Sequence, residues 1–133
     1  MTAEATVENP TPRVVRVLLV EDEPMLRELA ADILVEAGYD VTEASDGSGA
    51  LDILQATAPI DLLLSDIRLP GADGYELAAT GCALRPELKV ILMTGYAPTP
   101  LPTQLHGLVH DVLRKPFAID SLPEVIAAAL APA

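Results

Sequence analysis

Aromatic residues and cysteine are both scarce in this sequence. Aromatic residues make up 3% of the 133 residues, whereas 50% are hydrophobic, so a core must be built mainly from Val, Leu, Ile and Ala. A hydrophobic share this large argues against a wholly disordered chain. Cys82 has no second cysteine to pair with, which excludes an internal disulfide and a cysteine zinc cluster. A lone cysteine is compatible with a reducing cytoplasm, where we expect the protein to act.

Positive charge is also in short supply. There are 8 basic residues against 20 acidic ones, the net charge is -12, and no segment concentrates Lys and Arg. Proteins that bind nucleic acids do so largely through basic surfaces, so direct nucleic-acid binding is disfavoured. The sequence has no apolar run of transmembrane length and no signal-peptide core near Met1. It therefore predicts neither a membrane span nor export.

The length suits one domain of ordinary size. Residues 1–12 are polar and include prolines, and we expect a flexible leader there. Residues 13–133 are expected to form the single folded domain.

Apolar runs alternate with segments of helical spacing. Strands are predicted at residues 14–20, 39–44, 61–65, 89–93 and 108–113, each ending in a polar or turn-forming stretch. The first helix should run from Pro24 to Gly38, with Leu26, Leu29, Ala30, Ile33, Leu34 and Ala37 on its buried face. Further helices are expected after Asp46, before Leu84 and from about Asp120. This alternation predicts an α/β fold, a doubly wound five-stranded parallel sheet with helices on both faces.

One unit of the pattern is irregular. Pro98, Pro100 and Pro102 lie between the fourth and fifth strands, where they discourage a regular helix. We therefore expect the fourth helix to be short or irregular.

Polar side chains close four of the predicted strands. Glu21 and Asp22 follow the first strand, Asp66 follows the third, Thr94 ends the fourth, and Lys115 follows the fifth. Parallel strands end at the same edge of a sheet, which is where open α/β proteins bind ligands. We therefore expect these residues to form one site.

The acids in this set would repel one another unless a cation lay between them. Mg²⁺ fits, because it takes carboxylate oxygens and completes its shell with water and phosphate oxygens. Asp66 is the expected nucleophile, to be phosphorylated, with Lys115 paired to it at rest and the Thr94 hydroxyl donating to a phosphoryl oxygen. Asp22 is the expected direct metal ligand, and Glu21 is expected to act through water.

Four segments of the chain resemble the signature segments of response-regulator receiver domains in two-component signalling. They are VLLVEDEP at 17–24, LSDIRLPGADG at 64–74, MTGY at 93–96 and RKPF at 114–117, and the resemblance spans residues 14–130. It implies a flavodoxin-like (βα)5 fold with strand order 2-1-3-4-5. It also implies that Asp66 accepts phosphate from a sensor histidine kinase or a histidine phosphotransfer protein.

The resemblance implies further roles for individual residues. The backbone carbonyl of Arg68 is expected to ligate Mg²⁺, Lys115–Pro116 to be a cis peptide, and Thr94 to move toward the phosphate. The family commonly has an aromatic residue three positions before the lysine, but here that position is Val112. We therefore expect Tyr96 or residues 97–107 to take over part of the switch. Such a receiver, with a degenerate fourth helix, is a single-domain protein or part of a hybrid kinase, and the leader starting at Met1 favours the former.

Two alternative functions remain open at this point. A phosphatase working through an aspartyl phosphate would need a second acid near the nucleophile, but position 68 is Arg. A phosphate-independent interaction domain could use the same fold. A short tail after the last helix leaves output to protein contacts or onward phosphotransfer, with the downstream partner unknown.

Several other residues have simpler interpretations. We expect His106 and His110 to lie on the surface, Gly47 and Gly49 to belong to a helix start rather than a phosphate loop, and Cys82 to pack against the core.

Overall fold

The computed structural model describes residues 14–95 and 100–131. The expected leader and Tyr96 therefore lie outside the described residues. In chain order the elements are β1 (Arg16–Val20), α2 (Pro24–Glu36), β2 (Asp40–Ala44), α3 (Gly47–Gln55), β3 (Leu62–Asp66), α4 (Gly74–Leu84), β4 (Lys89–Thr94), the 3-10 turn η1 (Thr103–Leu105), β5 (Asp111–Arg114), the 3-10 turn η2 (Ile119–Ser121) and α5 (Leu122–Leu130).

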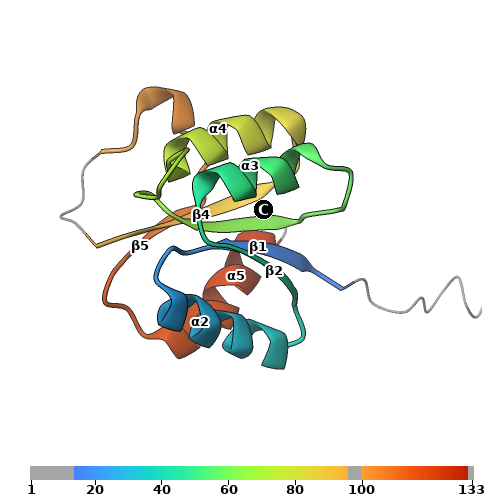
Figure 1. The fold of residues 1–133 in the computed structure, drawn as a ribbon, viewed down its shortest axis with the longest axis vertical. Helices are drawn as coiled ribbons and strands as arrows, with labels where there is room; N and C mark the ends of the chain where they lie inside the picture. The colour runs from blue at the N-terminus through green and yellow to red at the C-terminus, as the bar shows by residue number, and fades with distance from the viewer. Residues whose placement is uncertain (1–13, 96–99, 132–133) are drawn as a thin grey trace, which may run out of the picture.

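The strands form one five-stranded sheet in the order β2-β1-β3-β4-β5. Every neighbouring pair is parallel. Figure 1 shows α3 and α4 covering one face of the sheet and α2 and α5 covering the other. The predicted doubly wound, flavodoxin-like fold and its strand order are confirmed.

Alternate residues of the central strands supply two apolar layers. Leu18, Leu63 and Leu92 face the layer that includes residues of α3 and α4. Leu19 and Leu64 face the layer that includes residues of α2 and α5. All five side chains are fully buried, so aliphatic packing alone fills the centre of this domain.

The buried face of α2 differs from the predicted one. Ala30, Ala31 and Leu34 are buried, whereas Leu29 is 50% exposed. Consecutive residues are about 100° apart around an α-helix, so a face centred between Ala30 and Leu34 turns Leu29 toward solvent. The helix ends at Glu36, slightly earlier than predicted, with Ala37 as its C-cap, and Gly38 follows with the positive φ of 102° expected of a glycine at a helix end.

The connection from β4 to β5 has no α-helix in its described part. Only η1 is present there, held by Leu105, which is 1% exposed. The helix expected between β4 and β5, which is not the helix labelled α4, is therefore short or irregular, as predicted. β5 begins at Asp111 rather than at the predicted residue 108, because the N–H groups of Leu108 and Val109 donate to the Leu105 carbonyl in the turn after η1 instead of pairing with β4.

The described residues contain no helix that is both long enough and apolar enough to cross a membrane.

Candidate functional site

Two acids meet one lysine at the carboxyl edge of the sheet. Lys115 Nζ lies 2.6 Å from Glu21 Oε1 and 2.8 Å from Asp66 Oδ1. Glu21 directly follows β1, Asp66 is the last residue of β3, and Lys115 directly follows β5. The parallel topology therefore brings these side chains together as the sequence predicts.

Glu21 and Asp22 are neighbours in sequence but differ in environment. Glu21 is 1% exposed, and its Oε2 accepts a hydrogen bond of 3.1 Å from the backbone N–H of Glu23. Asp22 is exposed. Carboxylate oxygens of Glu21, Asp22 and Asp66 all lie within 4.8 Å of one another. Glu21 and Asp66 are thus buried, and Asp22 is the acid of this set that reaches solvent.

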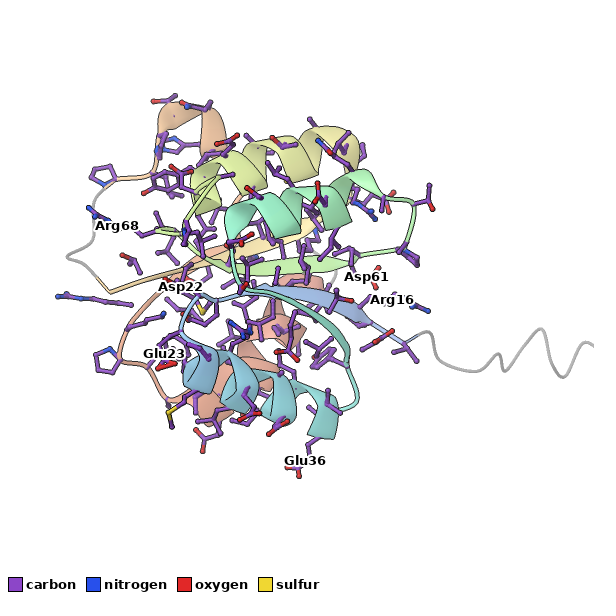
Figure 2. All side chains as sticks on the ribbon, in the orientation of Figure 1. Arg16, Asp22, Glu23, Glu36, Asp61 and Arg68 are labelled. Atoms are coloured by element: carbon purple, nitrogen blue, oxygen red, sulfur yellow. The ribbon has the colours of Figure 1, made fainter. Side chains whose placement is uncertain are left out.

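Asp22 and Asp66 also line a pocket of about 260 Å³. Its lining consists of Asp22, Asp66, Arg68, Met93, Thr94, Gly95 and Lys115. Figure 2 shows Asp22 and Arg68 at the same end of the sheet, with Arg16 and Asp61 at the opposite end. Thr94 and Arg68 therefore lie at the predicted site together with the acids and the lysine.

Backbone hydrogen bonds hold the loops of the site against the sheet. The N–H of Lys115 donates to the carbonyl of Thr94 at 2.7 Å, and the N–H of Ile67 donates to the carbonyl of Met93 at 2.9 Å. The peptide bond between Lys115 and Pro116 is cis, as the family resemblance implies. These two hydrogen bonds hold the backbone of Lys115 and of Ile67, the first residue after Asp66, against β4.

Burial and mutual contact shift the pKa values of the three central groups. Burial, aided by Glu21, raises the pKa of Asp66 to about 7, although Lys115 opposes the rise. Burial also pushes up the pKa of Glu21, but hydrogen bonds with Asp66, Lys115 and the Glu23 backbone outweigh it, and the pKa falls below its usual value. Burial pushes down the pKa of Lys115, but its contacts with Asp66 and Glu21 outweigh it and the pKa rises. Glu21 and Lys115 are therefore charged at neutral pH, while burial and the neighbouring Glu21 favour the protonated form of Asp66 relative to a free aspartate.

This donor set fits Mg²⁺. Its oxygens are hard ligands, clustered closely enough to share one ion, and the exposed Asp22 leaves room for water or phosphate oxygens. A cation there would also favour the ionised form of Asp66.

Some expectations fall outside the central cluster. Val112 lies on β5 and is 36% exposed, and Pro116 is exposed beside the site. His106 and His110 are exposed, as predicted. Asp46 caps α3 by accepting from the N–H of Gly49, which confirms that the glycines there belong to a helix start. Cys82 is half-buried against the core, also as predicted.

The sequence analysis missed Arg27. Its guanidinium donates to the Glu21 carbonyl at 2.9 Å. Its position in α2, six residues after Glu21, is the only sequence signal for this contact, and that spacing is common in any helix that follows a strand.

Comparison with known proteins points to one family. The sequence-family model of the response regulator receiver domain matches residues 17–127. The response regulator receiver protein CpdR of Brucella abortus is 39% identical over 108 residues, which cover 80% of this chain and 89% of that protein. Several other curated relatives are longer, and the chain matches between 12% and 44% of their length.

Solved structures agree with the sequence comparison. The receiver domain of the hybrid histidine kinase CckA is 36% identical with a TM-score of 0.73, covering 87% of this chain and 99% of that one. The response regulator TrrA of Thermotoga maritima, solved in complex with Mg²⁺ and BeF, is 30% identical with a TM-score of 0.70, covering 88% of this chain and 100% of that one. The chain therefore belongs to the response regulator receiver domain family and is a phosphorylation-dependent receiver of two-component signalling.

Proposed function

We propose that Asp66 is the phosphoacceptor, and that the phosphoryl group comes from a phosphohistidine on a sensor histidine kinase or a histidine phosphotransfer protein. The observation that carries this proposal is the contact of Lys115 with both Glu21 and Asp66, because Lys115 and Asp66 also line an open pocket. Asp66 is the member of the acid set that closes the central strand β3 and also lines that pocket.

In the transfer step, a carboxylate oxygen of Asp66 attacks phosphorus. The O–P bond forms as the N–P bond of phosphohistidine breaks, and the leaving imidazole keeps the electron pair of that bond. Lys115 loses its contact with one Asp66 oxygen and pairs with a phosphoryl oxygen instead. The Thr94 hydroxyl, on the same pocket wall, donates to another phosphoryl oxygen.

Asp22, Asp66 and the carbonyl of Arg68 would hold Mg²⁺, and Glu21 would act through water. The ion, when bound, neutralises negative charge on the transferred group. An indirect role for Glu21 is supported by its contacts, since one of its carboxylate oxygens meets Lys115 and the other accepts from the Glu23 N–H.

The domain acts on itself, through its own phosphorylation and dephosphorylation, rather than turning over a metabolite. A donor phosphohistidine on a sensor kinase implies a cytoplasmic location.

Output requires contact with a further protein or onward phosphotransfer. The candidate output surface consists of the β4–β5 connection, β5 and the last helix α5. Val112, which is 36% exposed, stands where the family commonly has an aromatic residue, so Tyr96 or residues 97–107 remain the predicted switch.

Intact-protein mass spectrometry tests the proposed function. The protein is incubated with acetyl phosphate and Mg²⁺, and the wild type is compared with Asp66→Asn, which keeps the side-chain shape. One phosphoryl adduct that needs both Mg²⁺ and Asp66 is expected. Normal labelling of Asp66→Asn would place the acceptor elsewhere.

A further inference from the structure

Arg27 joins the start of α2 to the metal-binding end of β1. Its Nη1 donates to the backbone carbonyl of Glu21 at 2.9 Å, and its Nε lies 3.5 Å from Glu43 Oε1 on β2. Its side chain is only 21% exposed. The Glu43 carboxylate therefore orients the guanidinium, and the guanidinium in turn holds the backbone carbonyl of Glu21.

The contacted carbonyl belongs to a residue that is held at each of its other polar groups as well. The N–H of Glu21 donates to the Ala44 carbonyl at 3.1 Å. Its two carboxylate oxygens meet Lys115 and the Glu23 N–H. With Arg27 on the carbonyl, both the main chain and the side chain of Glu21 are fixed.

Fixing this carbonyl also places the next residue. The carbonyl of Glu21 and the N–H of Asp22 lie in one peptide plane, which does not rotate about its central bond. The direction of the carbonyl therefore sets where the Cα and side chain of Asp22 begin. Asp22 is the exposed acid of the cluster, and its own surroundings constrain it less than those of the buried Glu21.

We infer that Arg27 is a positioning residue for Mg²⁺ binding, which acts through the Glu21–Asp22 peptide and is itself oriented by Glu43. This inference rests on the proposed function, because it assigns Asp22 to the metal. Residues that orient metal ligands commonly matter to affinity nearly as much as the ligands do.

The alternative is that Arg27 only ties α2 to the sheet, and charge separates the two roles. Removing a cation near an acidic site would by simple electrostatics tighten Mg²⁺ binding. Loss of positioning would weaken it. A variant that removes Arg27 and its partner charge together leaves the net charge unchanged and isolates the positioning effect.

The test variant is therefore Arg27→Met combined with Glu43→Gln. The chain offers a matched control in Arg16→Met combined with Asp40→Asn. That ion pair, at 3.1 Å, likewise contacts β2, but it starts from β1 rather than α2 and lies at the opposite end of β1 from Glu21. Figure 2 shows Arg16 far along the sheet from Asp22.

Mg²⁺ affinity is measured by isothermal titration calorimetry, and the metal-free melting temperature by circular dichroism. The Arg27 and Glu43 variant is expected to bind Mg²⁺ about tenfold more weakly, at the lower end of the effect of losing a residue that orients metal ligands. The control should bind as the wild type does. The ¹⁵N shift of the Asp22 amide, in the same peptide plane as the contacted carbonyl, should move in the test variant and not in the control.

Rescue separates positioning from general damage to the fold. Arg27→Lys keeps a charged donor and should recover part of the lost affinity. Unchanged or tighter Mg²⁺ binding by the test variant, or an equal loss in the control, would overturn the inference. Failure of the wild type itself to bind Mg²⁺ would instead count against the proposed function.

Discussion

Lys115 Nζ lies 2.6 Å from Glu21 Oε1, slightly nearer than its 2.8 Å contact with Asp66 Oδ1. The lysine thus rests between two acids rather than on Asp66 alone. Glu21, which is 1% exposed, depends on this cation to offset the cost of its burial. After transfer, Lys115 can turn to a phosphoryl oxygen while it keeps Glu21 as its second partner.

Lys115→Ala is therefore expected to destabilise the metal-free protein. The substitution leaves the buried Glu21 and Asp66 without their lysine partner. The expected loss is about 1–3 kcal/mol in the free energy of unfolding. Urea denaturation measures the change, and Lys89→Ala, at the exposed start of β4, is the matched control. Mg²⁺ should still bind to Lys115→Ala, because the acids remain. Collapse of Mg²⁺ affinity would contradict the role given to the lysine.

The raised pKa of Asp66 predicts how stability depends on pH without metal. Between pH 3.8 and about 7 the folded state keeps a proton on Asp66 that the unfolded state has lost, so stability falls as pH rises through this window. Thermal melts across that range in a chelator should show the decline. Asp66→Asn should reduce it, because the substituted side chain does not titrate. An unchanged decline in Asp66→Asn would assign the effect to other groups.

The loop that carries Arg68 packs tightly on the start of α3. A Cβ added at Gly47 would lie 1.8 Å from the Ala72 carbonyl oxygen, which is main chain and cannot swing aside. Gly47→Ala should therefore cost about 1–3 kcal/mol, as overpacking does, and disturb Mg²⁺ binding by moving this loop.

Gly49→Ala is the control for that experiment. Its added Cβ would lie 3.2 Å from Asp46 Oδ1, which belongs to a side chain, and α3 would gain the better helix propensity of alanine. Equal losses of stability in both variants, measured by urea denaturation, would show that backbone freedom rather than the clash matters at Gly47.

The sheet was predictable because apolar runs and the residues that close them are local patterns. Val17–Val20 and Leu62–Leu64 are continuous apolar segments, and parallel topology then requires their ends to meet at one edge. Asp66, Thr94 and Lys115 follow from that rule alone. The outward position of Leu29 did not follow, because the choice between neighbouring helix faces depends on packing against the sheet.

The sequence predicted which residues form the site better than it predicted how they contact one another. Residue type does not tell which of two adjacent acids is buried, yet Glu21 is buried and Asp22 is exposed. The start of β5 was also placed too early, because Leu108 and Val109 have strand-like side chains but their N–H groups donate to the Leu105 carbonyl in a turn. Arg27 was missed because a side-chain contact with a backbone carbonyl leaves no pattern in the sequence.

The most direct test locates the phosphoryl group chemically. The protein is phosphorylated with acetyl phosphate and Mg²⁺ and then treated with borohydride, which reduces an acyl phosphate to an alcohol and so turns a phosphorylated Asp into homoserine. Peptide mass spectrometry then reads the modified position. Homoserine at position 66, lost when Mg²⁺ is withheld, is the expected result. Homoserine at position 22 or at any other aspartate, with position 66 unmodified, would contradict the assignment of Asp66 as the phosphoacceptor.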